Sequence, residues 1–273
     1  MSERGDRRPV PFRGGGFAPV PRRLLPWIVF FILIAAWQAA SSAGLLPPLF
    51  MPSPAAVIDA LQVLWTNGSL AQNLGASLGR IIPGWIIGTA AGLAAGLAMG
   101  IFSAARAAGL PIVSALFPIP KIALLPLLIL WFGVGHLMAV VAVFLTSLLQ
   151  VVVHTYHGVT ATPAVLVWSA QALGASRRQV LRRILLPHAL PDIFTGLRVA
   201  LGFAFVVAIS AEMIASTAGI GRLTFMYGEN GAYDYMFAAV ASIVLVAFAA
   251  DRAILGLGAL CLRWHESAAG EGA

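Results

Sequence analysis

The chain has 273 residues, of which 60% are hydrophobic and only 10% are charged, and its net charge is +7. Its mean hydropathy is +0.91. A soluble domain carries about 25% charged residues, so this composition excludes a soluble protein and indicates about five to seven membrane spans of roughly 20 residues. The single cysteine, Cys261, excludes a disulfide framework and a multi-cysteine metal site. Because the arginines gather in particular segments, we interpret the charge as an orientation signal and not as a nucleic-acid surface.

The first 23 residues are rich in Arg, Pro and Gly and are predicted to form a disordered basic tail. The apolar run at 24–43 is either the core of a cleaved signal peptide or an uncleaved first span. It is long for a signal peptide, and no clear processing site leads into soluble sequence, which favours the span. A second short tail is predicted at 264–273.

Six apolar segments are predicted to cross the membrane within one domain at 24–263. Backbone groups in lipid must bond within their own segment, so these segments are expected to be helices. Strand-like alternation is absent, which argues against a barrel. The fold class is therefore an all-α, polytopic bundle of six transmembrane helices. The predicted spans are 24–43, 78–101, 108–132, 137–155, 194–216 and 236–260.

The arginines predict the orientation of these spans. With the N-terminus inside, the basic tail, Arg106, Arg263 and the run at 177–183 all lie in the cytoplasm, and the outer loops keep mainly Arg80 and Arg222. The positive-inside rule therefore predicts that both termini are cytoplasmic. It also places a polar segment, 160–193, on the cytoplasmic side.

The first external loop, about 44–77, begins with Met51-Pro52-Ser53-Pro54 and continues into a short amphipathic helix at 55–65. That helix either caps the bundle or contacts an external partner.

The second span carries a glycine at every fourth position, so the glycines follow one face of a helix. Small residues at this spacing let another helix approach closely. The row indicates either ordinary packing within the chain or a gate or subunit interface. It consists of Gly84, Gly88, Gly92, Gly96 and Gly100.

The third span contains four prolines, which predict a kinked or broken helix. Broken helices are tolerated inside protein or beside a water-filled cavity, and they commonly line transport paths. Lys121, the only lysine in the chain, follows Pro120 within this span. It either faces a path or lies at a membrane interface as an anchor.

The polar segment between the fourth and fifth spans contains a helix-turn-helix at 168–191. A first helical run breaks at Gly174, a second, basic run follows, and Pro187 is expected to end it. Such a unit between membrane spans suits docking to a soluble partner.

The fifth span holds an acid, Glu212, which is either a functional group or half of a structural ion pair. Arg198 lies about 21 Å along the same helix, too far to pair with Glu212, and is expected to anchor the inner surface. The pair Asp251-Arg252 is expected to be structural. His154 and His157 lack nearby carboxylates and do not predict a metal site.

The sequence shows no hydrolase elbow and no Walker A loop, because Lys121 follows a proline and not a glycine. We therefore expect no catalytic residues, no cofactor and no ATPase site in this chain. If transport is driven by ATP, another chain must bind it.

The helix-turn-helix resembles the coupling loop of ABC-importer permeases, whose pattern has Glu-Ala-Ala, a later Gly and then Leu-Pro. Here the Glu position is Trp168, so an acidic contact is replaced. Further likeness to nitrate/sulfonate/taurine-type permeases lies at 51–54, 117–133, 187–202 and 211–221. The resemblance assigns ATPase coupling to Trp168, Ser169, Ala170, Leu173, Gly174, Leu186 and Pro187. The broken third span and the acid within the fifth span predict a translocation path at Pro120, Lys121 and Glu212.

The resemblance implies a type I ABC-importer permease in the bacterial inner membrane. Its expected partners are ABC ATPase subunits, an extracytoplasmic substrate-binding protein, a second permease copy and membrane lipid. The implied solute is a small anion such as a sulfonate, taurine or nitrate. The alternative is a secondary transporter or channel that works alone, which would be expected to show several buried acids or an internal repeat. A membrane enzyme is disfavoured by the lack of a catalytic constellation.

Overall fold

The computed structural model describes residues 24–47 and 49–262, and within these residues it is helical without any strand. The expected tails and Arg263 lie outside the described residues. The helices are α1 (Leu25–Ser42), α2 (Pro54–Thr66), α3 (Ser69–Ile101), α4 (Ser103–Leu116), α5 (Leu125–Phe132), α6 (His136–Thr160), α7 (Ala164–Ala172), α8 (Arg177–Val180), α9 (Leu186–Ala215), α10 (Ile220–Glu229) and α11 (Tyr233–Cys261), with a 3₁₀ turn η1 (Lys121–Leu124) and a π-helical turn η2 (Leu181–Leu185).

Five helices of the described chain are long and apolar enough to cross a membrane, and a bent pair adds a sixth span. The pair consists of α4 and the η1–α5 segment, which meet at 85°. All six predicted segments are therefore helical, and the third is broken as its prolines predict. Pro118 and Pro120 lie in the break itself, and Pro126 lies in the first turn of α5.

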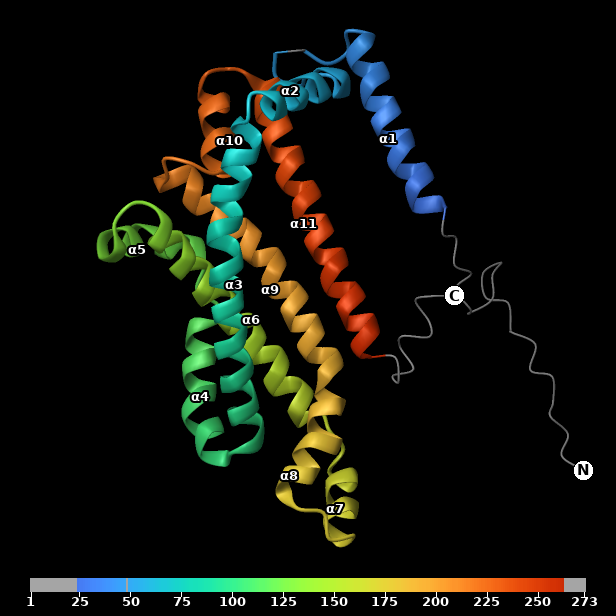
Figure 1. Ribbon diagram of the computed structural model, residues 1–273, viewed down its shortest axis with the longest axis vertical. Coiled ribbons are helices and arrows are strands. Elements are labelled where there is room, and N and C mark those ends of the chain that lie inside the picture. Colours follow the sequence, from blue (N-terminus) through green and yellow to red (C-terminus); the bar gives the residue numbers. More distant parts are fainter. Residues whose placement is uncertain (1–23, 48, 263–273) are drawn as a thin grey trace, which may run out of the picture.

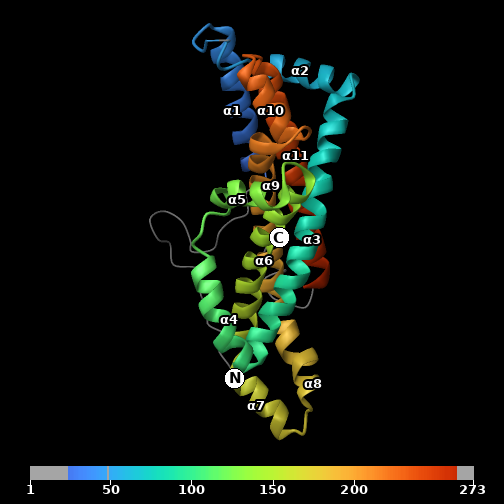
Figure 2. The ribbon, with the colours of Figure 1, turned by 90° about the vertical axis from the view of Figure 1, so that its left-hand side faces the viewer.

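The core of the bundle consists of α3, α6 and α9, with α11 beside α9 (Figure 1). The helices α2 and α10 lie at one end, and α7 and α8 project at the opposite end (Figure 2). The helix α1 stands apart with no buried residue. Its contacts are with α2 and, through Trp37, with the ring of Phe237 at 6.2 Å.

Apolar packing forms two main clusters. The larger one joins α2, α3, α9, α10 and α11 and includes Leu64, Ile81 and Ile220. The second joins α5, α6 and α9 around Leu125 and Met138, both fully buried. The short α5 of the broken span is therefore held against α6 and α9, which fixes where the break lies.

Two sequence-based expectations are corrected by the fold. Pro187 does not end a helix, because a single helix runs from Arg177 to Ala215. The amide of Leu186 donates to the carbonyl of Leu181, five residues back. This wider turn makes room for a ring that would otherwise meet the carbonyl four residues before it.

The second correction concerns Arg80. The arginine count assigned Arg80 to the outer side, at the edge of a span predicted to begin at 78. In the structure α3 begins at Ser69, and Arg80 lies well within it, with only 6% of its surface exposed. Polar side chains such as Asn73 and Ser77 lower the local hydropathy and made the span seem to begin at 78. In the structure these polar side chains form hydrogen bonds inside the bundle, Asn73 with Gly219 and Ser77 with Glu212.

Candidate functional site

The five glycines of α3 face α6 and form a contact that we call the glycine seam. A Cβ added at Gly88 would lie 2.7 Å from the carbonyl oxygen of Phe144, and one at Gly92 would lie 2.7 Å from that of Leu148. Side chains at these positions would therefore force the helices apart. The same holds at Gly84, which meets Val140 and Val143, at Gly96, which meets Thr155, and at Gly100, which meets Val159. The row thus packs within one chain.

Glu212 is completely buried and is surrounded by donors. Nη1 of Arg80 donates to its Oε1 at 2.7 Å, and the hydroxyl of Ser77 donates to its Oε2 at 2.8 Å. The amide of Gly221 donates to the same Oε2 at 3.0 Å. This geometry matches the structural ion-pair alternative for Glu212. We call this group of residues, with Asn73 and Gly219, the Glu212 network.

The network ties α3 to the loop between α9 and α10. Arg80 also donates to the carbonyl of Ala218 at 2.7 Å, and the amide of Ile220 donates to Ser77 at 2.9 Å. The amide of Gly219 donates to Asn73 at 2.8 Å. A loop that connects two helices is thereby held by side chains of a third.

Two glycines allow the loop to close over Glu212. Gly219 has a φ of +125°, and a Cβ there would lie 2.4 Å from the Glu212 carboxylate. A Cβ at Gly221 would lie 2.4 Å from the carbonyl oxygen of Ile209. The Gly-Ile-Gly sequence is therefore a steric requirement of the buried acid, although the sequence alone did not connect it to Arg80.

Lys121 lies at the break of the third span, apart from the Glu212 network. Its Nζ donates to the carbonyl of Phe117 at 2.7 Å and lies 5.4 Å from the centre of that ring. Pro120 before it is extended and is the residue that precedes η1, whereas α4 already ends at Leu116. Exposed apolar side chains surround the break, including Ile119 and Ile122. Within the described chain, the side chain of Lys121 hydrogen-bonds to Phe117 and that of Glu212 to Ser77, Arg80 and Gly221, so no hydrogen bond joins these two predicted path residues.

The helix-turn-helix forms a projecting unit, the α7–α8 hairpin, made of α7, α8 and η2. Gly174 has a φ of +83°. Its amide donates to Gln171 at 2.9 Å, and the amide of Ala175 donates to Ala170 at 2.9 Å. These two bonds are a Schellman cap, for which a glycine in the left-handed region is preferred. The predicted break at Gly174 thus has a defined geometry.

The second limb of the hairpin starts at Ser176. Its hydroxyl accepts from the amide of Gln179, and the Gln179 side chain accepts from the amide of Ser176 at 2.7 Å. This capping box sets where the long helix begins. The residues assigned to coupling differ in exposure: Trp168, Ser169, Leu173 and Gly174 are exposed, whereas Ala170, Leu186 and Pro187 are half-buried.

Other charged residues join the long helices. Arg198 of α9 forms a two-pronged ion pair with Asp251 of α11, including a contact from Nη2 to Oδ2 at 3.1 Å. Arg252 lies over the ring of Phe248 at 4.7 Å. Asp251 therefore has the structural role that was expected, but its ion-pair partner is Arg198 and not Arg252. His154 contacts the carbonyl of Gln150 through Nδ1 at 2.8 Å and packs on Gly196, between α6 and α9.

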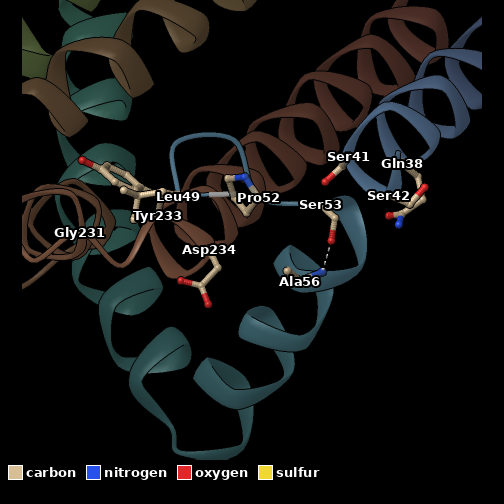
Figure 3. A pocket seen from close by; sticks show the side chains of 10 residues that line it. All are labelled: Gln38, Ser41, Ser42, Leu49, Pro52, Ser53, Ala56, Gly231, Tyr233 and Asp234. Atoms are coloured by element: carbon tan, nitrogen blue, oxygen red, sulfur yellow. Dashed lines mark hydrogen bonds between the residues drawn. The ribbon is translucent and has the colours of Figure 1, made fainter. Parts of the chain in front are cut away.

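A polar hollow that sequence reasoning missed lies at the end of α1 (Figure 3). Its volume is about 410 Å³. Ser53 lies in it and accepts from the amide of Ala56 at 3.2 Å, which caps α2. Oxygen-bearing side chains come from both ends of the described chain. They are Gln38, Ser41, Ser42, Ser53, Tyr233 and Asp234.

These features define a class before any comparison is made. The chain is an all-α, multi-pass membrane protein with a tightly packed three-helix core, one broken span and a capped helical hairpin at one end. It belongs to the family described as binding-protein-dependent transport system inner membrane component, which matches residues 84–257. That range covers the glycine seam, the broken span, the hairpin and Glu212 with its glycine loop, whereas Asn73, Ser77 and Arg80 of the Glu212 network lie just before it.

Characterised relatives share most of the chain. The taurine transport system permease protein TauC of Escherichia coli is 34% identical over 86% of this chain and 87% of its own. A putative aliphatic sulfonates transport permease protein of the same organism, SsuC, is 36% identical over 89% and 92%. The riboflavin transport system permease protein RibX of Chloroflexus aurantiacus is 34% identical over 88% and 90%. The chain is thus an ABC-importer permease subunit.

Solved structures support the fold. An inward-facing MetNI methionine ABC transporter chain aligns with a TM-score of 0.57, 21% identity, and coverage of 74% of this chain and 95% of that chain. A chain from an amino acid ABC transporter aligns with a TM-score of 0.56, 19% identity, and coverage of 74% and 97%. The type I permease fold expected from the sequence is confirmed.

The glycine seam predicts graded damage from side-chain volume at Gly92. Replacement by Ala and then Leu should progressively lower the unfolding temperature of the purified protein, since overpacking costs about 1–3 kcal/mol. The matched control is Gly202, where an added Cβ would meet nothing within 4 Å. Equal unfolding temperatures for Gly92→Leu and Gly202→Leu would contradict the seam.

The buried ion pair of the Glu212 network predicts that removing one of its two charges destabilises the protein more than removing both. Glu212→Gln leaves a buried arginine unpaired, which typically costs about 3–5 kcal/mol, whereas replacing both charges by apolar groups is often neutral. Glu212→Gln should therefore unfold at a lower temperature than the double variant Arg80→Met/Glu212→Leu. Glu229→Gln, at an exposed site at the end of α10, is the control. A double variant less stable than the single one would refute the pairing.

Proposed function

We propose that this chain forms the path for a small anionic solute in an ATP-driven importer of the bacterial inner membrane. The observation that carries the proposal is the α7–α8 hairpin: an exposed, doubly capped unit joined without a break to a helix that runs through the bundle to Glu212. A force applied to the hairpin would be transmitted along that helix. ATP itself would be bound by separate ATPase subunits, since this chain has no Walker A sequence.

The orientation follows from where the arginines gather. Arg106, near the start of α4, and the arginines at 177–183, in α8 and η2, lie toward the end of the fold where α7 and α8 project (Figure 1). The start of α1 and the finish of α11 are the ends of these helices that face away from α2 and α10 (Figure 1). The opposite end carries α2, α10 and Arg222. The positive-inside rule then supports a cytoplasmic hairpin and cytoplasmic termini. With Arg80 internal, the arginine asymmetry is larger than the sequence-based placement gave.

Docking to the ATPase is proposed to use shape and apolar contact. Trp168 and Leu173 are 66% and 89% exposed on a hairpin that projects from the bundle (Figure 2), so both side chains are available for apolar contact. Ser169, Ala170 and Gly174 complete the turn, and Leu186-Pro187 lies at the base of the long helix. Trp168 stands where the family pattern has Glu, so a large apolar side chain takes the place of an acid.

The transported solute is proposed to be a sulfonate, taurine, nitrate or a similar anion. Two relatives are named for taurine and aliphatic sulfonates. In this chain, Lys121 and Pro120 lie at the break of the third span, where one cation is surrounded by exposed apolar side chains. A second permease copy would enclose the path by covering this surface. A substrate-binding protein would deliver solute at the end formed by α2 and α10.

The test is reconstitution in liposomes with the ATPase subunits and the binding protein. The proposal predicts ATP-dependent uptake of the solute and stimulation of ATP hydrolysis by the loaded binding protein. Uptake driven by an ion gradient without the ATPase would instead establish a secondary transporter, the alternative that the comparisons do not favour.

Gly174 provides a test of the coupling role. Proline has no amide hydrogen and cannot adopt the φ of +83° found there, so Gly174→Pro should destroy the Schellman cap. ATP hydrolysis should then continue while uptake falls toward background. Gly174→Asn is the control, because Asn tolerates the left-handed region. Normal uptake in Gly174→Pro would count against coupling through the hairpin.

Lys121 provides a test of the path. Lys121→Ala should reduce anion uptake without loss of the complex, and Lys121→Arg should restore part of it, since weak attraction assists conduction. In a Cys261→Ser background, which removes an exposed thiol, Lys121→Cys should react with a water-soluble reagent and be protected by substrate. Normal uptake by Lys121→Ala, with labelling that ignores substrate, would show that Lys121 is only an anchor.

A further inference from the structure

The second limb of the α7–α8 hairpin carries a concentrated positive charge that nothing in the described chain balances. Four arginines occur within seven residues, all exposed, and we call them the arginine cluster: Arg177, Arg178, Arg182 and Arg183. The sequence from 160 to 191 contains no Asp or Glu. The ion pairs of the described residues use only Arg80 and Arg198. The cluster is therefore free to meet an external anion.

Part of the cluster lines a hollow of about 330 Å³. Arg178, Arg182 and Arg183 contribute to its wall together with Ser176 and Gln179. Arginines 178 and 182 are four residues apart, and like charges at this spacing destabilise a helix. Arg177 and Arg178 also lie in the first turn of the 177–215 helix, where the dipole disfavours positive charge. Both effects are relieved when carboxylates approach.

The surface beside the cluster is apolar. Four exposed apolar side chains belong to the first limb, and Leu173 lies directly before the capped turn that leads into the cluster. They are Val165, Leu166, Trp168 and Leu173. A free anion would occupy the hollow and leave these side chains in water. A protein groove with an apolar floor and an acidic rim would cover both parts at once.

We propose that the arginine cluster docks against carboxylates on the rim of the groove in the ATPase subunit that receives the hairpin. The inference rests on the proposed coupling role. The sign of the charge that the hairpin brings to the contact is reversed. The first limb has Trp168 where the family pattern has an acid, and the second limb supplies positive charge through its arginines. Each guanidinium can form two parallel bonds to a carboxylate, which fixes orientation as well as attraction.

The test is the affinity of the detergent-solubilised permease for the ATPase subunit that co-purifies with it, measured at rising salt concentration. Arg178→Glu/Arg182→Glu should weaken binding about tenfold or more, and wild-type binding should fall as salt rises. Arg178→Lys/Arg182→Lys keeps the charge and should retain most of the affinity. The control is Arg252→Glu, an exposed arginine in α11. Each variant is first checked for an unchanged unfolding temperature.

A second pair of substitutions separates this inference from the proposed function. Trp168→Ala/Leu173→Ala removes the apolar contact and should also release the ATPase. If that pair releases the ATPase but the Glu variant binds like wild type, coupling stands and the acidic rim is wrong. If neither releases it, both are wrong. A Glu variant that binds the ATPase normally but loses binding to vesicles containing phosphatidylglycerol would overturn the inference in favour of a lipid surface.

Discussion

The glycine seam between α3 and α6 is the contact on which the rest of the structure depends. Lipid tails are as apolar as leucine side chains, so spans in a membrane gain little by avoiding lipid and associate through close packing. At Gly84, Gly88 and Gly92 the backbone of α6 lies where a side chain would otherwise stand. This close approach fixes the position of α3 along its axis, and its rotation about that axis, relative to α6. It thereby decides which residues of α3 face α9.

The seam and the Glu212 network occupy successive stretches of the same helix. The C-terminal part of α3 packs on α6 through the seam. Its N-terminal part positions Ser77 and Arg80 against the carboxylate of Glu212. Glu212 is near the end of a helix that begins at the capped turn after Gly174. The α9–α10 loop closes over it through Gly219 and Gly221. In the coupling that we propose, a displacement of the α7–α8 hairpin would reach the opposite end of the bundle through one helix and one buried ion pair.

Local patterns in the sequence predicted local structure well. The spacing of the glycines predicted a close helix contact, and the prolines around Lys121 predicted a broken span. Gly174 predicted a turn between two helices. Each of these depends on a steric property of the residue itself: a missing side chain, a fixed φ or a tolerated left-handed backbone. Such properties act wherever the residue is placed, so the sequence is sufficient to read them.

Features that join distant segments were not predictable in the same way. Arg80 and Glu212 are 132 residues apart, and no local pattern in the sequence connects them. The polar hollow of Figure 3 joins the end of α1 to the start of α11. Pro187 was misjudged because a π-helical turn before it can absorb its ring. These errors share one cause: long-range packing changes the meaning of a local signal.

The central claim is that the hairpin and the three-helix core move as one body when ATP acts on the complex. Pulsed electron paramagnetic resonance can measure this with spin labels at Val165 of α7 and at Ile82 of α3, both exposed and neither assigned to the ATPase contact, in a Cys261→Ser background. The account predicts that the Val165–Ile82 distance within one labelled copy is the same with and without ATP, while the Val165–Val165 distance between two copies shortens. A Val165–Ile82 distance that changes with ATP while the distance between copies stays constant would contradict it.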